Sequence, residues 1–379
     1  MDRLLPAALL QSPIAEVSTP DVSIIVPARN EETSLGACLE SLTAQTGVAF
    51  EIIVVDDGST DRTRQIAQSF AGVRVIFPEP LHENLAGKTW TGKNNALVAG
   101  AKKARASWLL FTDADTVHLP GSLARAMDEA KKERADLLSY SPEQVVVTFA
   151  ERAVLPVIFA ELAARYPPHK VRDEASKIVA ANGQYILVRR AAYDAVGGHA
   201  AVATEILEDV ALARLFRDAG HRVYFRYGGD AVRTRMYRNW AQLREGWTKN
   251  LALLFPQTER LALQSLSVWF LAWSTLGVAA YGAASQHFAR TAFAVIWLLV
   301  YRRITVAHFA ALNNLIAIAV GLPMFAYLLL RSKKAQVKGQ VSWKGRTYNV
   351  GDGSAGTRPK AQAATPTSRI ESSKLRTEN

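Results

Sequence analysis

Residues 109–120, LLFTDADTVHLP, join an apolar run to two acidic residues, Asp113 and Asp115, and a glycine follows at position 121. A short apolar run before such a turn is typical of a buried strand. Side chains at positions i and i+2 of an extended chain point to the same side. We therefore expect both carboxylates to converge on one ligand, and two carboxylates at a strand end suit Mg²⁺ or Mn²⁺. Alone, the D-x-D pattern is a weak signal, because a solvated turn produces it too.

Short β-rich runs alternate with helical patterns between residues 22 and 140. Strands are predicted over 22–28, 51–57, 73–77 and 107–113, and helices over roughly 31–45 and 91–106. This alternation predicts an α/β fold with a mostly parallel sheet and helices on both faces. Ligands of such sheets bind beyond the carboxyl ends of the strands. Three predicted strand ends carry polar clusters: PARNEE (27–32), DDGSTD (56–61) and DADT (113–116).

Two of these clusters have a structural interpretation beside the functional one. Asp57 can accept the N3–H group of a uracil ring, whereas Ser59 or Asp61 can cap the next helix. Asn30, Glu31 and the glutamate after them open a predicted helix, where the helix dipole favours acidic residues. The residues alone do not decide between these roles.

The next hundred residues, 136–235, are less regular. Residues 177–199, KIVAANGQYILVRRAAYDAVGGH, predict a strand pair that continues into a helix. Residues 205–225, EILEDVALARLFRDAGHRVYF, predict a helix that ends at Gly220, followed by a strand. The apolar stretch 145–166 predicts either an interfacial helix or a core helix.

The C-terminal part contains three apolar segments without Asp, Glu, Lys or Arg: 261–289, 291–301 and 304–330. A membrane-spanning helix needs about 20 residues, so the first and last segments are long enough and the middle one is marginal. Arg302, Arg303 and the basic residues from Arg331 onward all favour the cytoplasmic side. Three full spans would export the tail, so either one segment is re-entrant or interfacial, or the charge rule fails here.

Most of the net charge of +11 lies in residues 331–379, which hold eleven Lys and Arg against three acidic residues. A basic tail after apolar segments indicates a membrane surface rather than nucleic acid. The single cysteine, Cys38, excludes an internal disulfide. The N-terminal MDRLLPAALLQSP is a poor signal peptide, so we expect the first domain to stay in the cytoplasm. The tail from about residue 351 is predicted to be disordered.

The order and spacing of these motifs resemble the nucleotide-sugar half of a GT-A (Rossmann-like) family 2 glycosyltransferase, the group that includes cellulose, chitin and ceramide-glucoside synthases. The motifs are PARNEE, DDGSTD, GKTWTGKNNAL (87–97), DADT, GQYILVRRAAYDAVGGH (183–199) and ILEDVALARLF (206–216). They span about residues 22–250. The apolar C-terminus with WKGRTY (343–348) looks like the hopene-associated and carotenoid-type lipid glycosyltransferases.

The resemblance implies a division of the chain and a set of site residues. The domains would be an extension (1–20), a GT-A domain (21–250, with halves 21–135 and 136–250), a membrane region of two to three helices (261–330) and a basic tail (331–379). Asp209 would be the general base, and Asp115 would bind Mg²⁺ or Mn²⁺ together with Asp113. The implied nucleotide-sugar ligands are Pro27, Asn30, Glu31, Asp57, Lys93, Asp113, Arg244 and Trp247.

One motif departs from the family pattern. The (Q/R)xxRW signature is replaced by QLREGW (242–247), in which four residues instead of three separate Gln242 from Trp247. This departure puts the diphosphate contacts of Arg244 and Trp247 in question and argues against processive synthesis. Lys93 is either a neighbour of the diphosphate or a solvated lysine.

The sequence therefore predicts an inverting glycosyltransferase at the cytoplasmic face of the inner membrane. It would move a sugar from a nucleotide-diphosphate sugar, with UDP as the expected carrier, to a hydroxyl of a hopanoid, carotenoid or similar lipid. Two alternatives remain open. A nucleotidyltransferase acting on sugar phosphates would carry a glycine-rich basic loop where PARNEE stands, and a non-catalytic membrane-tethered protein would bind nucleotide sugar without turnover.

Overall fold

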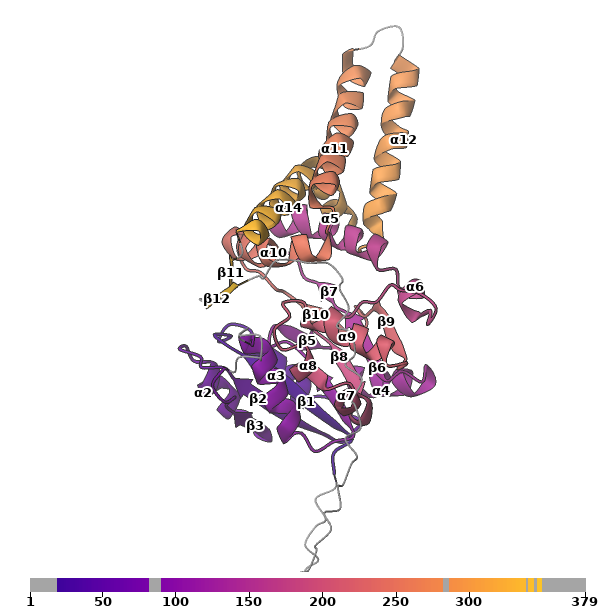
Figure 1. The fold of residues 1–379 in the computed structure, drawn as a ribbon. Helices are drawn as coiled ribbons and strands as arrows, with labels where there is room; N and C mark the ends of the chain where they lie inside the picture. The colour runs from indigo at the N-terminus through magenta and orange to yellow at the C-terminus, as the bar shows by residue number, and fades with distance from the viewer. Residues whose placement is uncertain (1–18, 82–89, 282–285, 339, 344–345, 350–379) are drawn as a thin grey trace, which may run out of the picture.

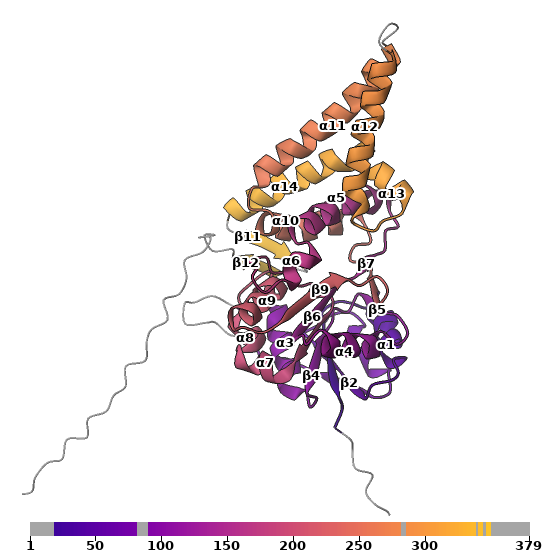
Figure 2. The ribbon, with the colours of Figure 1, turned by 90° about the vertical axis from the view of Figure 1, so that its right-hand side faces the viewer.

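The computed structural model describes residues 19–81, 90–281, 286–338, 340–343 and 346–349. An α/β domain lies beneath a layer of helices, and a hairpin of helices α11 (Thr258–Tyr281) and α12 (Gln286–Thr305) projects from that layer (Figures 1 and 2). The N-terminal residues 1–18, residues 87–89 of the GKTW motif and the tail from residue 350 lie outside the described residues.

The central sheet has seven strands in the order β3-β2-β1-β4-β8-β6-β9. Their bounds are Val22–Ala28 (β1), Phe50–Asp56 (β2), Val73–Ile76 (β3), Trp108–Phe111 (β4), Leu137–Ser141 (β6), Ile186–Arg189 (β8) and Val223–Tyr227 (β9). Strand β1 pairs in parallel with β2 and β4, and only β8 runs antiparallel to its neighbours, β4 and β6. The expected GT-A-like, mostly parallel sheet is confirmed.

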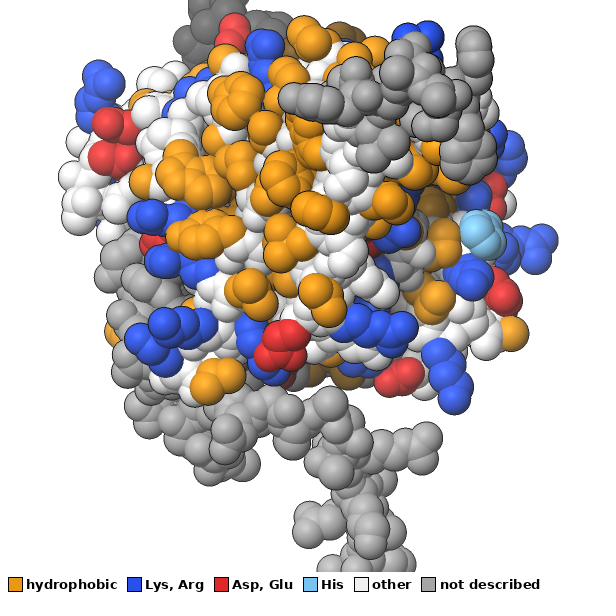
Figure 3. Space-filling view, turned by 90° about the horizontal axis from the view of Figure 1, so that it is seen from above, with side chains coloured by type: hydrophobic (Ala, Val, Ile, Leu, Met, Phe, Trp, Pro, Cys, Tyr) orange, Lys and Arg blue, Asp and Glu red, His pale blue; other side chains and the backbone are white. Residues whose placement is uncertain are grey.

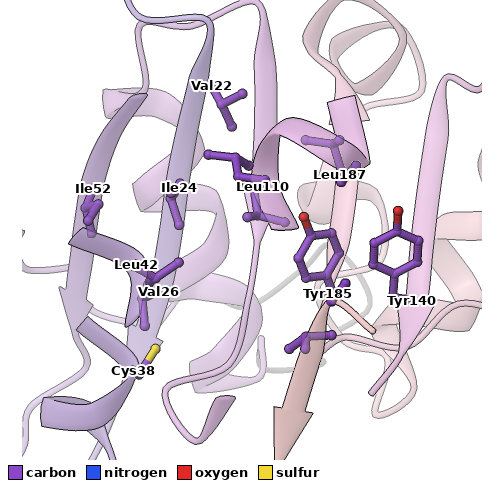
Figure 4. Close-up of a cluster of buried hydrophobic side chains, with 14 of the residues drawn as sticks. Val22, Ile24, Val26, Cys38, Leu42, Ile52, Leu110, Tyr140, Tyr185 and Leu187 are labelled. Atoms are coloured by element: carbon purple, nitrogen blue, oxygen red, sulfur yellow. The ribbon is translucent and has the colours of Figure 1, made fainter. Parts of the chain in front are cut away.

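Helices cover both faces of this sheet. They are α1 (Leu35–Thr43), α2 (Thr63–Gln68), α3 (Gly92–Lys103), α4 (Ser122–Lys132), α6 (Pro168–Arg172), α7 (Arg190–Ala195), α8 (Gly198–Ala201) and α9 (Glu208–Asp218). Successive strand residues point to opposite faces, so Ile24 packs with Leu42 of α1 (Figure 4) and Ile25 packs with Leu97 of α3. The strand pair expected within 177–199 is wrong, because β8 is the one strand there. The residues before β8 form a turn at Asn182, whose N–H donates to Ser139 Oγ at 2.8 Å.

A second sheet of three short strands flanks the first and carries the order β5-β10-β7. These strands are Thr116–His118 (β5), Glu143–Gln144 (β7) and Val232–Thr234 (β10). Strand β5 follows β4 after only a short turn. The pairing of β5 with β10 in the small sheet therefore holds the C-terminal end of that turn in place.

The helical layer has its own hydrophobic core. It is built from α5 (Phe149–Arg165), α10 (Trp240–Leu254), α13 (Ala311–Ile316), the π-helix η1 (Ala317–Gly321) and α14 (Leu322–Val337). Ile158 of α5, Leu251 of α10 and Phe325 of α14 are fully buried in this core. The apolar stretch 145–166 is therefore mainly a core helix.

The prediction of two to three membrane helices is only partly supported. Among the described residues, the continuous helix Ala311–Val337 is the one that is long and apolar enough to cross a membrane, and half of its apolar window is buried in the protein. The segment 304–330 is broken at residues 306–310, where His308 adopts a left-handed φ of 61°. Strands β11 (Gln340–Trp343) and β12 (Arg346–Asn349) form a separate two-stranded sheet.

Glu129 of α4 forms hydrogen bonds that link this helix to strands β6 and β9. Its carboxylate accepts hydrogen bonds from Arg226 Nε at 2.8 Å, from Tyr224 Oη at 2.9 Å and from Tyr140 Oη. Burial alone would raise the pKa of Glu129, but the hydrogen bonds from Arg226 and the tyrosines outweigh it and lower that pKa. The carboxylate therefore stabilises the fold above its unfolded-state pKa, and this contribution is lost as the pH falls through the folded-state value.

We expect Glu129→Ala to destabilise the α/β domain by about 2 kcal/mol, because hydrogen bonds to charged groups contribute on that order. In a domain of this size the melting midpoint should fall by roughly 4–8 °C. Thermal unfolding followed by circular dichroism at pH 7 measures the change. Asp128→Ala, one residue away on the exposed side of α4, is the matched control. Equal shifts in the two variants would contradict the role assigned to Glu129.

Candidate active site

A cleft of about 910 Å³ opens at the carboxyl ends of β1, β2 and β4 and is roofed by α5, α10 and the connection between α12 and α13. The parallel strands end at one edge of the sheet, so their terminal residues meet there. The cleft brings together nine of the ten residues predicted from the sequence: Pro27, Asn30, Glu31, Asp57, Lys93, Asp113, Asp115, Asp209 and Trp247.

The first polar cluster is fixed by bonds across the sheet edge. The N–H groups of Asn30 and Glu31 donate to Ser59 Oγ at 3.1 Å and to Thr63 Oγ1 at 2.7 Å. Because these amides donate to side chains in the segment that follows β2, they are not available for a helix at this point. The helix expected from residue 31 begins only at Leu35. The interpretation of PARNEE as a helix opening is thus wrong, and the segment is a loop that lines the cleft.

Asp57 stands directly after β2, where its backbone is held on both sides. Its N–H donates to Ala28 O at 2.9 Å, and its carbonyl oxygen accepts from Arg29 Nη1 at 2.6 Å. Asp57 lines the cleft, and its contact with uracil stays a prediction.

Asp113 and Asp115 lie in a turn between β4 and β5, not in an extended strand as the i, i+2 argument assumed. The turn forms because the carbonyl oxygen of Asp113 accepts from Thr116 Oγ1 at 2.8 Å. The carbonyl oxygen of Asp115 accepts from Thr234 Oγ1, on β10, at 3.1 Å. Both residues nevertheless line the same cleft, and their convergence on one ligand stays a prediction.

The donor chemistry of this turn fits a hard divalent cation. Mg²⁺ and Mn²⁺ are commonly held by one or two carboxylates while phosphate oxygens and water complete the shell. Asp113 Oδ1 accepts from Lys93, and the carboxylates of Asp113 and Asp115 supply hard oxygen donors of the kind that such a cation prefers. No group of three or more Asp, Glu, His or Cys side chains is gathered for a metal within the described part of the chain.

Lys93, in the first turn of α3, joins the two halves of the site. Its Nζ lies 2.8 Å from Asp113 Oδ1 and 2.8 Å from Glu208 Oε1. Burial would lower the pKa of Lys93, but the two carboxylates outweigh it and raise that pKa well above its usual value. Lys93 is thus an ion-paired cation beside the predicted metal ligands, although about a third of its side chain is exposed.

Asp209 lies next to this cation in the first turn of α9. Its Oδ2 accepts from the N–H of Gly183 at 2.9 Å, and its Oδ1 accepts from the N–H of Val210 at 2.8 Å. Burial, followed by the negative charge of Glu208, raises the pKa of Asp209 to about 6. Such a carboxylate is ionised at neutral pH and still basic enough to accept a proton.

Helix α10 places only one of its two predicted residues in the cleft. The residues of α10 that line the cleft are Gln242, Glu245, Gly246, Trp247, Lys249, Asn250 and Leu254. At 100° per residue, Arg244 lies opposite the face formed by Gln242, Glu245 and Lys249. Arg244 is not among the residues that line the cleft, so the structure does not support its predicted contact with the diphosphate. Trp247 is buried and packs edge-on against Phe159 at 6.0 Å between ring centroids.

Sequence reasoning missed Glu208 and Lys249. Glu208 precedes the predicted base in the same LED motif, but nothing local shows that it pairs with a lysine far away in the sequence. Lys249 lies seven residues after Gln242, and this helical spacing is the signal that could have found it.

Comparison with known proteins agrees with this geometry. The family description "Glycosyl transferase family 2" matches residues 23–197. Those residues form a family 2 glycosyltransferase domain. The glycosyltransferase is similar to 4,4'-diaponeurosporenoate glycosyltransferase of Staphylococcus aureus strain USA300, with 27% identity over 87% of this chain and 88% of that protein. The same-named protein of strain MRSA252 is 28% identical over equal coverage.

Two solved structures are also similar to the chain. S. aureus TarS 1–349 in complex with UDP-GlcNAc has a TM-score of 0.41 and 16% identity, covering 88% of this chain and 97% of that one. Mannosyltransferase PcManGT from Pyrobaculum calidifontis, in complex with GDP-Man and Mn²⁺, has a TM-score of 0.45 and 17% identity, covering 85% and 88%. The family match to residues 23–197 favours glycosyl transfer from a nucleotide sugar over nucleotidyl transfer.

Proposed function

We propose that this glycosyltransferase is a metal-dependent, inverting enzyme that transfers a sugar from a UDP-sugar to a hydroxyl of a membrane lipid. The observation that carries the proposal is the single cleft that holds Asp57, Asp113, Asp115 and Asp209. The position of Asp57 in this cleft supports uracil binding. The position of Asp209 supports proton abstraction in the same cleft, and Lys93 is paired with Asp113 and Glu208 there.

In the reaction, Asp209 takes the proton of the acceptor hydroxyl. The acceptor oxygen attacks the anomeric carbon from the face opposite the diphosphate, and the bond between that carbon and the diphosphate oxygen breaks. The carboxylates of Asp115 and Asp113 would hold the divalent cation, which when bound offsets the charge on the departing diphosphate. The ammonium of Lys93, fixed by Asp113 and Glu208, adds a positive charge nearby.

The apolar surface of the α11–α12 hairpin supports a membrane location. At least half of each of the following side chains is exposed: Leu263, Phe270, Leu271, Leu298 and Leu299. Viewed from the hairpin side, hydrophobic side chains gather at the centre and Lys and Arg lie around the margin (Figure 3). Exposed apolar patches rimmed by polar residues mark membrane or protein contacts, and the basic margin favours an anionic lipid surface.

The hairpin also bears on the topology question raised by the sequence. If the hairpin is directed toward the membrane, Arg302 and Arg303, at the base of α12, stay on the side of the catalytic domain. Helix α14 packs against α10 and α5 instead of pointing outward, so Lys333 and Lys334 stay on that side too. This arrangement satisfies the positive-inside rule with the catalytic domain at the cytoplasmic face of the inner membrane.

The name of the S. aureus relative suggests a second acceptor chemistry. Diaponeurosporenoate is a carboxylate, and a carboxylate attacks the anomeric carbon without first losing a proton. The raised pKa of Asp209 favours the hydroxyl acceptor, and replacement of Asp209 distinguishes the two.

The test is transfer of radiolabelled glucose from UDP-glucose to lipid in membranes that contain the protein. We expect EDTA and Asp115→Asn each to lower transfer at least tenfold, because both remove the cation that offsets the diphosphate charge. Added Mn²⁺ should restore the EDTA-treated wild type but not the variant. Asp218→Asn, at the exposed far end of α9, is the matched control.

Full transfer in EDTA would contradict metal dependence. Absence of labelled lipid with every UDP-sugar tried would contradict the lipid acceptor. Release of pyrophosphate from UTP and a sugar phosphate would instead support the nucleotidyltransferase.

A further inference from the structure

The helical layer contributes apolar side chains to the lining of the catalytic cleft. One face of α5 lines it with Phe159, Leu162, Ala163 and Tyr166. These positions follow the i, i+3, i+4, i+7 spacing of a single helix face. Leu254 of α10 also lines the cleft. A nucleotide sugar is a polar molecule and has few apolar groups that could pack against such a surface.

The connection between α12 and α13 packs beside α5, with Phe309 6.2 Å from Phe159 between ring centroids, and also lines the cleft. Val306, Ala307 and His308 line the cleft, and the ring of His308 stacks on Tyr227 of β9 with centroids 4.1 Å apart. The left-handed φ of His308, 61°, is unfavourable for a side chain with a Cβ. The stacking therefore holds this connection against the α/β domain in spite of the backbone cost.

This connection also joins the cleft to the apolar hairpin. Val306 is about half exposed and follows directly on α12, whose exposed face carries Leu298 and Leu299. Val306 thus links the hairpin to the cleft along the chain, because it follows α12 directly and also lines the cleft. Asp209 lines the same cleft.

We propose that the apolar part of the cleft, lined by Leu162, Ala163, Leu254 and Val306, is the port that holds the hydrocarbon tail of the acceptor. The inference rests on the proposed function and specifies it: the acceptor is an extended apolar chain that carries its nucleophilic oxygen at one end. The tail lies between α5 and the α12–α13 connection, and the oxygen reaches Asp209. The cleft that these residues share with Asp209, and the position of Val306 directly after α12 of the apolar hairpin, identify this occupant.

The first test compares a long and a short acceptor of the same chemistry, geranylgeraniol and prenol, in detergent. We expect Ala163→Trp, which fills the port, to lower the ratio of kcat/KM for geranylgeraniol over prenol at least tenfold. Ala164→Trp places the same side chain on the exposed side of α5 and should leave that ratio unchanged. Equal ratios in the wild type and in Ala163→Trp would overturn the port.

The second test does not depend on turnover or on a substitution in the port. A hexadecanol that carries a diazirine at mid-chain is photo-crosslinked to the Asp209→Asn protein, and the labelled peptides are mapped by mass spectrometry. We expect label on the peptides that contain Leu162 and Val306, and less label when geranylgeraniol competes. Label confined to α11 and α12 would overturn the port even if transfer to lipid is found, whereas port labelling without any transfer would refute only the proposed reaction.

Discussion

Replacement of Asp209 by asparagine is expected to lower kcat for transfer to a hydroxyl acceptor by about 10²–10⁴-fold, the usual contribution of a general base. Asparagine keeps the size of the side chain and can still accept from the N–H of Gly183. It cannot take up the proton. Transfer from UDP-glucose to geranylgeraniol measures kcat, and the binding of UDP-glucose to the variant shows whether the donor half remains intact.

The pH dependence of the wild type tests the same role. A base with a pKa of about 6 is protonated and inactive below that pH, so kcat should rise with pH through about 6 and then level off. Glu208→Gln removes the negative charge that helps to raise the pKa of Asp209. The acid limb of the profile should therefore shift to lower pH in Glu208→Gln.

Two outcomes would contradict this assignment. If Asp209→Asn keeps most of the activity, the acceptor arrives already ionised and needs no base. If the acid limb of Glu208→Gln moves to higher pH, the charge of Glu208 does not act on Asp209 as its position implies. The Asp218→Asn variant, on the same helix but outside the cleft, should show the wild-type profile.

Strands and strand-end clusters could be predicted from the sequence because their signals are local. The run VSIIVPA matches β1 residue for residue, and parallel strands that end together explain why Asp57 and Asp113 share a cleft. The turn at Asp113 could not be predicted, because it depends on a hydroxyl from β10 as well as on its own sequence. The pairing of Lys93 with Glu208 spans more than a hundred residues and leaves no local pattern.

The packing of the helical layer is a second feature that could not be predicted from the sequence. Hydropathy showed that residues 145–166 and 304–330 are apolar, but two apolar helices packed on each other give the same signal as helices in lipid. In the structure α5 and α14 are partners in one core. Helix α5 therefore belongs by packing to the C-terminal helices, although it lies within the sequence range expected for the catalytic domain.

The contact between α5 and the C-terminal helices leads to the second large expected effect, that of Gly321→Ala. A Cβ atom at Gly321 would lie 1.9 Å from the carbonyl oxygen of Ala153 and 3.2 Å from Val157 Cγ2. The carbonyl oxygen of Ala153 belongs to the backbone of α5 and cannot rotate away. Helix α5 and the π-helix η1 must therefore separate to admit a methyl group. Overpacking of a buried contact costs about 1–3 kcal/mol, and we expect the upper end of that range.

The measurement is thermal unfolding in detergent, followed by the loss of helical circular dichroism. Gly277→Ala is the matched control, because among the described atoms outside the backbone of α11 none lies within 4 Å of a Cβ built at Gly277. In a helix that substitution should be neutral or stabilise the protein by about 0.5–1 kcal/mol. Since α5 also lines the apolar part of the cleft, Gly321→Ala should weaken transfer to geranylgeraniol more than transfer to prenol. A melting midpoint in Gly321→Ala as high as in Gly277→Ala would show that α5 and η1 are not packed as closely as the structure has them.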